Sequence, residues 1–236
     1  MKTYRIADIV VGMEVRGRTL KQAAPYEIPY TTPEMLVYSH PEALHATQPH
    51  LSIEDCEYIL TGQCFYKRLS FFNGMMLHSS CVVVDDRAYL FTAASGVGKS
   101  THTDLWLQML GDRAYILNDD KPALRIIDDR LMAYGTPWSG MEDRSVNRGI
   151  PVAGIAVLKR SDTNSIRPIS PLEATFHLLD QSVKGWSDTG GDRFYAIVDK
   201  IVHSTKFYEL SCNMDLSAAM LSYEIMTETR LNENED

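Results

Sequence analysis

One stretch decides the fold that this sequence predicts: Ala93-Ala94-Ser95-Gly96-Val97-Gly98-Lys99-Ser100-Thr101. A small residue, four variable positions and then Gly-Lys-Ser match the Walker A template of a phosphate-binding loop. In such a loop the glycines let consecutive backbone N–H groups turn inward around phosphate oxygens. The sequence departs from the template at the first position, where Ala93 replaces the glycine. The alternative is a glycine-rich turn with a solvated lysine.

The loop residues have separate expected roles. Lys99 would pair with the β- and γ-phosphates, and Ser100 would ligate Mg²⁺ through its hydroxyl. The positive end of the following helix would face the anion. ATP is expected rather than GTP because the sequence has no Asn-Lys-x-Asp guanine motif. The residues predicted to bind the nucleotide are Ser95, Gly96, Val97, Gly98, Lys99, Ser100 and Thr101.

The segments on either side of the loop have the order that its chemistry requires. A short buried strand is expected over residues 88–92 and a helix over residues 103–110. Upstream, residues 75–84 form a nearly continuous apolar run that ends in an acidic turn, so a hairpin leads into the loop. His78 lies within this run. The residues alone leave it either a core histidine or a functional one.

A pair of carboxylates follows the loop helix. An expected strand over residues 113–117 ends in Asn118, Asp119 and Asp120. Acidic residues at this place, downstream of a phosphate loop, are where a Mg²⁺ ligand or a general base is expected. The alternative is a simple Asn-Asp-Asp turn.

Further downstream the pattern predicts alternating strands and helices. Trp138 lies in an expected loop over residues 135–141, where it either walls a ligand or packs in the core. Arg144 and Arg148 are either an arginine clamp for a phosphoryl group or a solvated charge run. The remaining elements are a hairpin over 123–127 and 131–134, a strand over 152–158, a helix capped by Ser170, a loop over 186–192, a helix over 193–203, a strand over 206–210 and a helix capped by Asp215.

The chain divides into two expected parts. Residues 1–70 predict a β-rich N-terminal extension, with strands over residues 4–11 and 13–18, and helix is poorly supported there. Residues 52–60 fit either a short capped helix or a strand. Residues 71–236 form the domain that carries the loop. The fold class is therefore α/β in the broad sense, a mixed α+β protein.

Composition limits the partners. With 236 residues, 44% of them hydrophobic, the chain can fill a large core. The formal net charge of −8 argues against a nucleic-acid or anionic-membrane partner. Four cysteines without a Cys-x-x-Cys pair predict reduced thiols, and neither a signal peptide nor an 18-residue apolar span is evident. A cytoplasmic location follows as an expectation.

These motifs together resemble the HPr kinase/phosphorylase family and, more distantly, the ATP-dependent phosphoenolpyruvate carboxykinases that share its P-loop core. Residues 95–100 match the last six positions of the family loop, G-D-S-G-V-G-K-S. The resemblance covers about residues 74–160. The family aspartate beside the first loop glycine is Ala94 here, and Val146 stands where the family has a glutamate.

The resemblance implies roles for three residues outside the loop. The family has a catalytic histidine fifteen residues before the first loop position, and His78 stands there. It also has an Asp-Asp pair after the loop helix, which implies Asp120 as the base and Asp119 as the metal ligand, or the two exchanged. A P-loop kinase-like domain over residues 71–236 is then expected, with His78, Lys99 and Asp120 catalytic and with Ser100 and Asp119 on the metal.

The resulting hypothesis is a Mg-ATP-dependent kinase that phosphorylates a hydroxyl, as in serine, on a peptide, a protein or a small molecule. Relatives of this kind are often oligomeric, so a homo-oligomer is an additional expectation. The alternative is a nucleotide-binding regulatory module of the same fold without transferase activity. A descendant that has lost nucleotide binding is a third interpretation.

Overall fold

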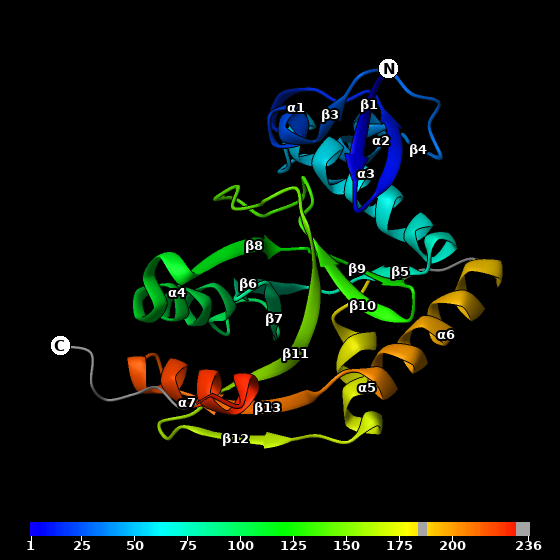
Figure 1. Ribbon diagram of the computed structural model, residues 1–236. Coiled ribbons are helices and arrows are strands. Elements are labelled where there is room, and N and C mark those ends of the chain that lie inside the picture. The colour runs from blue at the N-terminus through cyan, green and yellow to red at the C-terminus, as the bar shows by residue number, and fades with distance from the viewer. Residues whose placement is uncertain (184–187, 230–236) are drawn as a thin grey trace.

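The central strands bury both of their faces, which explains the unbroken apolar run of the sequence. In the computed structural model, which describes residues 1–183 and 188–229, strands β6 (Ser79–Val84) and β7 (Arg87–Thr92) form the predicted hairpin (Figure 1). Side chains alternate between the two faces of a strand. Thus Val83 joins one apolar cluster, while Val82 and Val84 join the cluster on the opposite face.

The larger sheet has nine strands in the order β5-β9-β10-β11-β7-β6-β8, with β13 against β11 and β12 against β13. Its long strand β11 pairs antiparallel with β10 near one end and parallel with β7 and β13 along the rest. The strands not yet bounded are β5 (Gly74–Met76), β8 (Ala114–Asp120), β9 (Ala123–Ile127), β10 (Arg130–Tyr134), β11 (Gly149–Arg160), β12 (Ser165–Pro168) and β13 (Phe207–Cys212).

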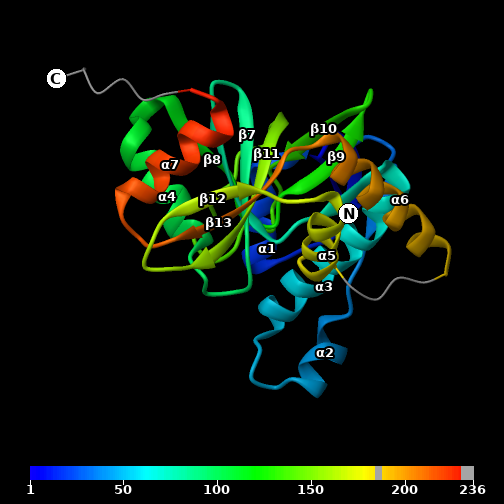
Figure 2. The same cartoon turned by 90° about the horizontal axis from the view of Figure 1, so that it is seen from below.

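Helices cover both faces of this sheet. On one face α4 (Lys99–Leu110) lies beside α7 (Leu216–Thr227), and the opposite face holds α5 (Pro171–Asp180) and α6 (Asp188–Ser204) (Figure 2). The mixed α+β class is therefore confirmed, with seven α-helices in the described residues.

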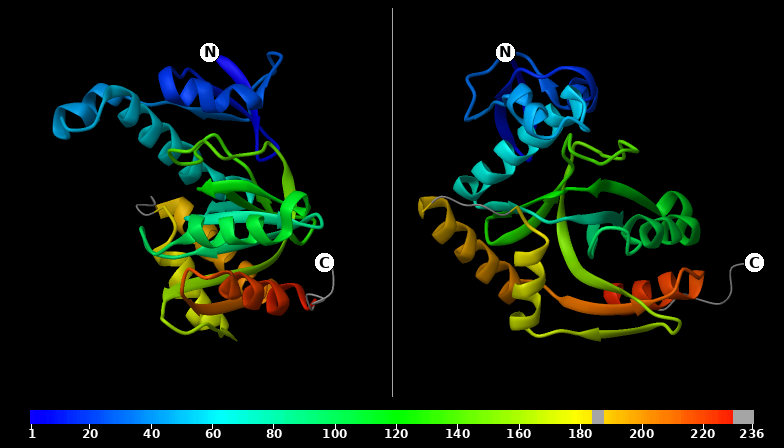
Figure 3. Two further views of the ribbon diagram at one scale, coloured as in Figure 1. Left: turned by 90° about the vertical axis from the view of Figure 1, so that its left-hand side faces the viewer. Right: turned by 180° about the vertical axis from the view of Figure 1, so that it is seen from behind.

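The first seventy residues form a second layer at one end of the larger sheet (Figure 3). They contain a four-stranded sheet in the order β3-β1-β2-β4 and three helices. The elements are β1 (Lys2–Ile6), β2 (Ile9–Met13), α1 (Gly17–Ala23), β3 (Glu27–Ile28), β4 (Met35–Val37), α2 (Pro41–Thr47) and α3 (Ile53–Leu69).

The prediction that helix is poorly supported in this region was wrong. Helix α3 runs for 17 residues, and the Ser52 hydroxyl caps it by accepting from the Asp55 backbone N–H at 3.0 Å. The two predicted strands were also wrong in their bounds. A turn at Ala7 and Asp8 divides the strand predicted over residues 4–11 into β1 and β2, and in place of a strand over residues 13–18 the chain leaves β2 at Met13 and turns into α1 at Gly17, whose φ is +45°. A side chain at Gly17 would collide with Glu54 of α3, so the turn is packed directly against that helix.

An apolar cluster joins the N-terminal layer to the larger sheet. Phe65 and Tyr66 of α3 pack with Trp138, and the Phe65 and Trp138 rings stack with centroids 4.9 Å apart. The cluster also contains Met76 and Tyr134 from beyond residue 70. Trp138 therefore packs in the core, while a domain boundary at residue 70 stays a prediction.

Most of the other predicted elements are confirmed, although Asp215 precedes α7 without a side-chain capping hydrogen bond. The second hairpin turns at Asp128 and Asp129, whose φ values of 48° and 59° suit a tight turn. Ser170 and Glu173 form the capping box at the start of α5. Helix α6 begins at Asp188, so the predicted loop over residues 186–192 was wrong from residue 188 onward, while Trp186 lies outside the described residues.

No helix in residues 1–183 and 188–229 combines the length and the apolar character that a membrane span needs.

Candidate active site

The predicted phosphate loop connects strand β7 to helix α4, in the strand-loop-helix order that such a loop requires. Gly96 and Gly98 have φ values of 78° and 121°, in the region that favours glycine. An added Cβ at either position would meet no atom within 4 Å. Backbone conformation, rather than space, therefore calls for glycine. The 12-residue helix α4 begins at Lys99, so its first N–H groups, which have no intrahelical acceptor, point toward the loop.

The loop opens onto a cleft of about 470 Å³. This cleft brings together residues that are predicted from separate parts of the sequence. Its wall contains His78, Ser95, Gly96, Gly98, Lys99, Ser100, Thr101, Asp119, Asp120, Ser139, Gly140, Met141 and Glu142. Of the predicted nucleotide-binding residues, Val97 alone is absent from this wall, because its half-buried side chain packs against the core and lines a neighbouring cleft.

Ser100 and Asp119 are in direct contact at the wall of the cleft. The Ser100 hydroxyl donates to Asp119 Oδ1 at 2.9 Å. Asp119 Oδ2 accepts from two nitrogens of Arg144, Nε at 3.1 Å and Nη2. The Asp119 side chain is only 7% exposed, so Arg144 supplies the charge that allows a buried carboxylate. Arg144 is thus no solvated charge, whereas Arg148 contacts the ring of Tyr115 and lies away from the cleft.

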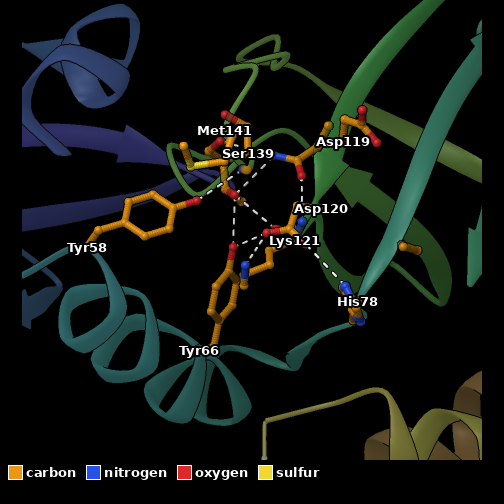
Figure 4. A network of polar contacts seen from close by, with 12 residues as sticks. Tyr58, Tyr66, His78, Asp119, Asp120, Lys121, Ser139 and Met141 are labelled. Atoms are coloured by element: carbon orange, nitrogen blue, oxygen red, sulfur yellow. Dashed lines mark hydrogen bonds and ion pairs between the residues drawn. The ribbon is translucent and has the colours of Figure 1, made fainter. Parts of the chain in front are cut away.

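Asp120 lies between His78 and Lys121 (Figure 4). Its Oδ1 is 3.2 Å from His78 Nε2, and its Oδ2 contacts the Lys121 ammonium group. Burial alone would raise the pKa of the Asp120 carboxyl. The hydrogen bond from His78 and the charge of Lys121 outweigh burial and lower this pKa below 3.8. Asp120 is therefore ionised at neutral pH.

Gln181 holds His78 in position. The Gln181 side-chain amide donates to Asp180 at 2.7 Å, so its carbonyl oxygen faces His78 Nδ1 at 3.1 Å. The backbone N–H of His78 also donates to the Gln181 carbonyl at 2.8 Å. His78 lies in the link between β5 and β6 with a partly exposed ring, so it is no core histidine.

Lys99 reaches back across the loop and donates to the Ala93 carbonyl oxygen at 3.2 Å. Burial lowers the pKa of the Lys99 ammonium group, while Asp120 and Asp119 act in the opposite direction. A second arginine holds the loop from outside, since Arg160 at the end of β11 donates to the carbonyls of Gly96 and Val97.

Sequence reasoning missed Gln181, Lys121 and Arg160. Lys121 directly follows the carboxylate pair, so its place in the sequence could have identified it as a site residue. Gln181 is 103 residues from His78, and no local pattern points to it.

The residues present fit a Mg²⁺ ion at Ser100 and Asp119. Neighbouring ligands of an octahedral Mg²⁺ with bonds of 2.0–2.1 Å lie about 2.9 Å apart. The Ser100 and Asp119 oxygens are hydrogen-bonded at 2.9 Å, so both lie close enough to contact one ion. Mg²⁺ in kinase sites is usually held by one or two carboxylates together with substrate phosphates, and Asp119 supplies one carboxylate. In the described residues no group of three His, Cys, Asp or Glu side chains is arranged to hold a metal ion.

Comparison with known proteins gives little further guidance. No family model and no curated protein matches the sequence. Among solved structures, the chain is similar to the HPr(Ser) kinase/phosphatase from Coxiella burnetii, with 13% identity and a TM-score of 0.39. The match covers 65% of this chain and 97% of that one. Values of this size do not establish a family or an activity.

Proposed function

We propose that the protein is a Mg-ATP-dependent kinase that transfers the γ-phosphoryl group to a hydroxyl. One observation carries this proposal: the loop with Lys99, the Ser100 and Asp119 pair and the ionised Asp120 all line one cleft. These are the parts that phosphoryl transfer needs, namely a phosphate cradle, metal ligands and a carboxylate that orients the nucleophile. A site that only binds nucleotide does not need a carboxylate that orients a nucleophile.

The clefts on the two sides of the loop suit the two halves of ATP. The phosphates would lie in the first cleft against the loop amides, with Lys99 moving from the Ala93 carbonyl to the β- and γ-phosphates. A second cleft of about 510 Å³ shares Gly98 and Thr101 with the first. Its walls include Leu105 and Arg160, so it offers both apolar contact and charge to the nucleoside.

Asp120 is the base in this proposal. The acceptor hydroxyl would donate to Asp120, and its oxygen would attack the γ-phosphorus as the bond to the β,γ-bridging oxygen breaks. The hydroxyl proton passes to Asp120, and ADP leaves. His78, held by Gln181, supports the Asp120 carboxylate by donating from Nε2. Mg²⁺ held by Ser100 and Asp119 would neutralise charge on the phosphates.

A direct test incubates the protein with γ-labelled ATP, Mg²⁺ and a panel of hydroxyl acceptors, which includes free serine, HPr and serine-containing peptides. The proposal expects label on at least one acceptor and none in Lys99→Ala. A fluorescent ATP analogue measures nucleotide binding in the same samples. Binding without any labelled product would reject the kinase.

The rival function is a nucleotide-binding regulatory module. One observation favours it: both oxygens of Asp120 are engaged, one by His78 and one by Lys121. An acceptor hydroxyl must therefore compete for the carboxylate. The module binds ATP and transfers nothing to any acceptor, and the labelling test separates the two.

A further inference from the structure

A further cavity, separate from the two clefts that are assigned to ATP, lies beside the proposed catalytic cleft. It has a volume of about 510 Å³, within the range of small-molecule sites. Its walls come from α3 of the N-terminal layer, from β5 and from the loop after β10. The lining includes Tyr58, Ile59, Gly62, Gln63, Tyr66, Lys67, Met76, Lys121, Trp138 and Val183.

We infer that this cavity binds the body of the phosphoryl acceptor, and that the acceptor is a small molecule with a bulky apolar part, such as an aromatic ring, and an anionic group. The inference rests on the proposed kinase function. It adds the chemistry of the second substrate.

The position of the cavity supports this role. Asp120 lines the ATP cleft, the next residue, Lys121, lines the cavity, and their side chains form an ion pair. Figure 4 shows Tyr58 and Tyr66, which line the cavity, on one side of this pair and His78 on the other side. A molecule seated in the cavity would thus reach the base with a hydroxyl on a short arm.

The aromatic side chains that line the cavity are buried, and their polar atoms are already paired. Trp138 Nε1 donates to Thr61 at 3.2 Å, and the Tyr66 hydroxyl donates to the Lys121 carbonyl. The Tyr58 hydroxyl accepts from the Gly140 N–H at 3.1 Å. Aromatic rings whose O–H and N–H groups are already hydrogen-bonded favour an apolar or aromatic ligand group over a strongly hydrated one.

The cavity carries a positive charge from the Lys67 ammonium group, in a chain whose net charge is −8. Lys67 is half-buried at the wall, and in the described part of the chain no carboxylate forms an ion pair with it. Lys121 shares Asp120 with His78. An anionic group on the ligand would therefore find an uncompensated cation in Lys67. The ligand is therefore expected to carry a negative charge, because an anionic group would form a charge-assisted hydrogen bond with Lys67.

Three N-acetylated dipeptides test both features of the ligand. N-acetyl-Ser-Phe carries the hydroxyl, the ring and a carboxylate. Its amide lacks the negative charge and imitates a segment inside a longer peptide, and N-acetyl-Ser-Gly lacks the ring. Calorimetry on the full chain without nucleotide measures binding. Transfer from γ-labelled ATP with Mg²⁺ is measured separately, so that each idea can fail alone.

N-acetyl-Ser-Phe should bind at least about tenfold more tightly than N-acetyl-Ser-Gly, as expected for burying an aromatic side chain. It should bind about tenfold more tightly than its amide, the value of a hydrogen bond to a charged group. Lys67→Met should remove the preference for the carboxylate and leave affinity for the amide unchanged. The matched control Lys21→Met removes an exposed lysine on α1 and should change neither affinity.

A second variant, Gln63→Trp, places a large side chain at the cavity mouth from an exposed helical position. It should abolish binding of N-acetyl-Ser-Phe and leave ATP affinity unchanged. Equal affinities for the three dipeptides, or no measurable binding of any, would overturn the inference about the cavity. The predicted binding pattern with no labelled product would uphold the ligand chemistry of the cavity and reject the kinase.

Discussion

Replacing Arg144 by methionine tests the charge arrangement of the site. Arg144 donates from two nitrogens to Oδ2 of Asp119, whose side chain is 7% exposed. The variant leaves this carboxylate with the Ser100 hydroxyl as its remaining side-chain partner. The contact of Arg144 with Asp104 adds little, because the Asp104 side chain is half exposed.

The magnitude follows from burial. Breaking a buried ion pair by removing one partner costs about 3–5 kcal/mol. The Arg144 side chain is 25% exposed, so water reaches the gap, and we expect a loss of about 2–3 kcal/mol in the free energy of unfolding. For a chain of this size that loss lowers the melting temperature by about 5–10 °C.

Urea unfolding of four proteins measures the effect: wild type, Arg144→Met, Asp119→Asn and the double variant. The cycle should give a coupling energy of at least about 1 kcal/mol. Arg148→Met is the matched control, since its ion pair with Asp86 is long, at 3.7 Å, and exposed, and it should change stability by less than about 0.5 kcal/mol. A coupling energy near zero would refute the electrostatic account of Asp119.

Three further predictions concern pH, packing and the loop. The pKa of Asp120 is lower in the folded than in the unfolded protein, so its carboxylate stabilises the fold above pH 3.8 and loses this effect as the pH falls through the folded value. Asp120→Asn should therefore flatten the acid limb of stability measured by urea unfolding between about pH 3 and 7; an unchanged limb would contradict this. Trp138→Ala should cost about 3–5 kcal/mol in thermal or urea unfolding, because a buried ring stacked on Phe65 is lost, and a cost below about 1 kcal/mol would argue against the joined core. Gly98→Ala should weaken ATP binding, measured by calorimetry, at least about fivefold through strain of about 1–3 kcal/mol at φ 121°, whereas Gly111→Ala, beyond the far end of α4, should leave it unchanged.

Local chemistry made much of the larger sheet predictable. Each hairpin turn has two adjacent aspartates, which tolerate a positive φ, and the Ser170 capping box fixes the start of α5. The long helix α3 was less visible, because its buried residues face both the N-terminal sheet and Trp138, so its sequence lacks one clear apolar stripe.

The candidate site could be assembled from the sequence only in part. The loop and the carboxylate pair are contiguous motifs, and the structure brings them together in one cleft. The partners that set their charge come from elsewhere in the chain. Arg144 is 25 residues from Asp119 and Gln181 is 103 residues from His78. Such pairs are set by the sheet order, which a single sequence does not encode locally.

The central claim is that Asp120 serves phosphoryl transfer rather than nucleotide binding. Its most direct test compares wild type with Asp120→Asn, using γ-labelled ATP, Mg²⁺ and the dipeptide and serine acceptors, with ATP affinity measured on the same preparations. We expect transfer to fall at least about 100-fold while ATP affinity changes less than about threefold. Undiminished transfer in the variant, or no transfer by a wild-type protein that binds ATP, would contradict the account.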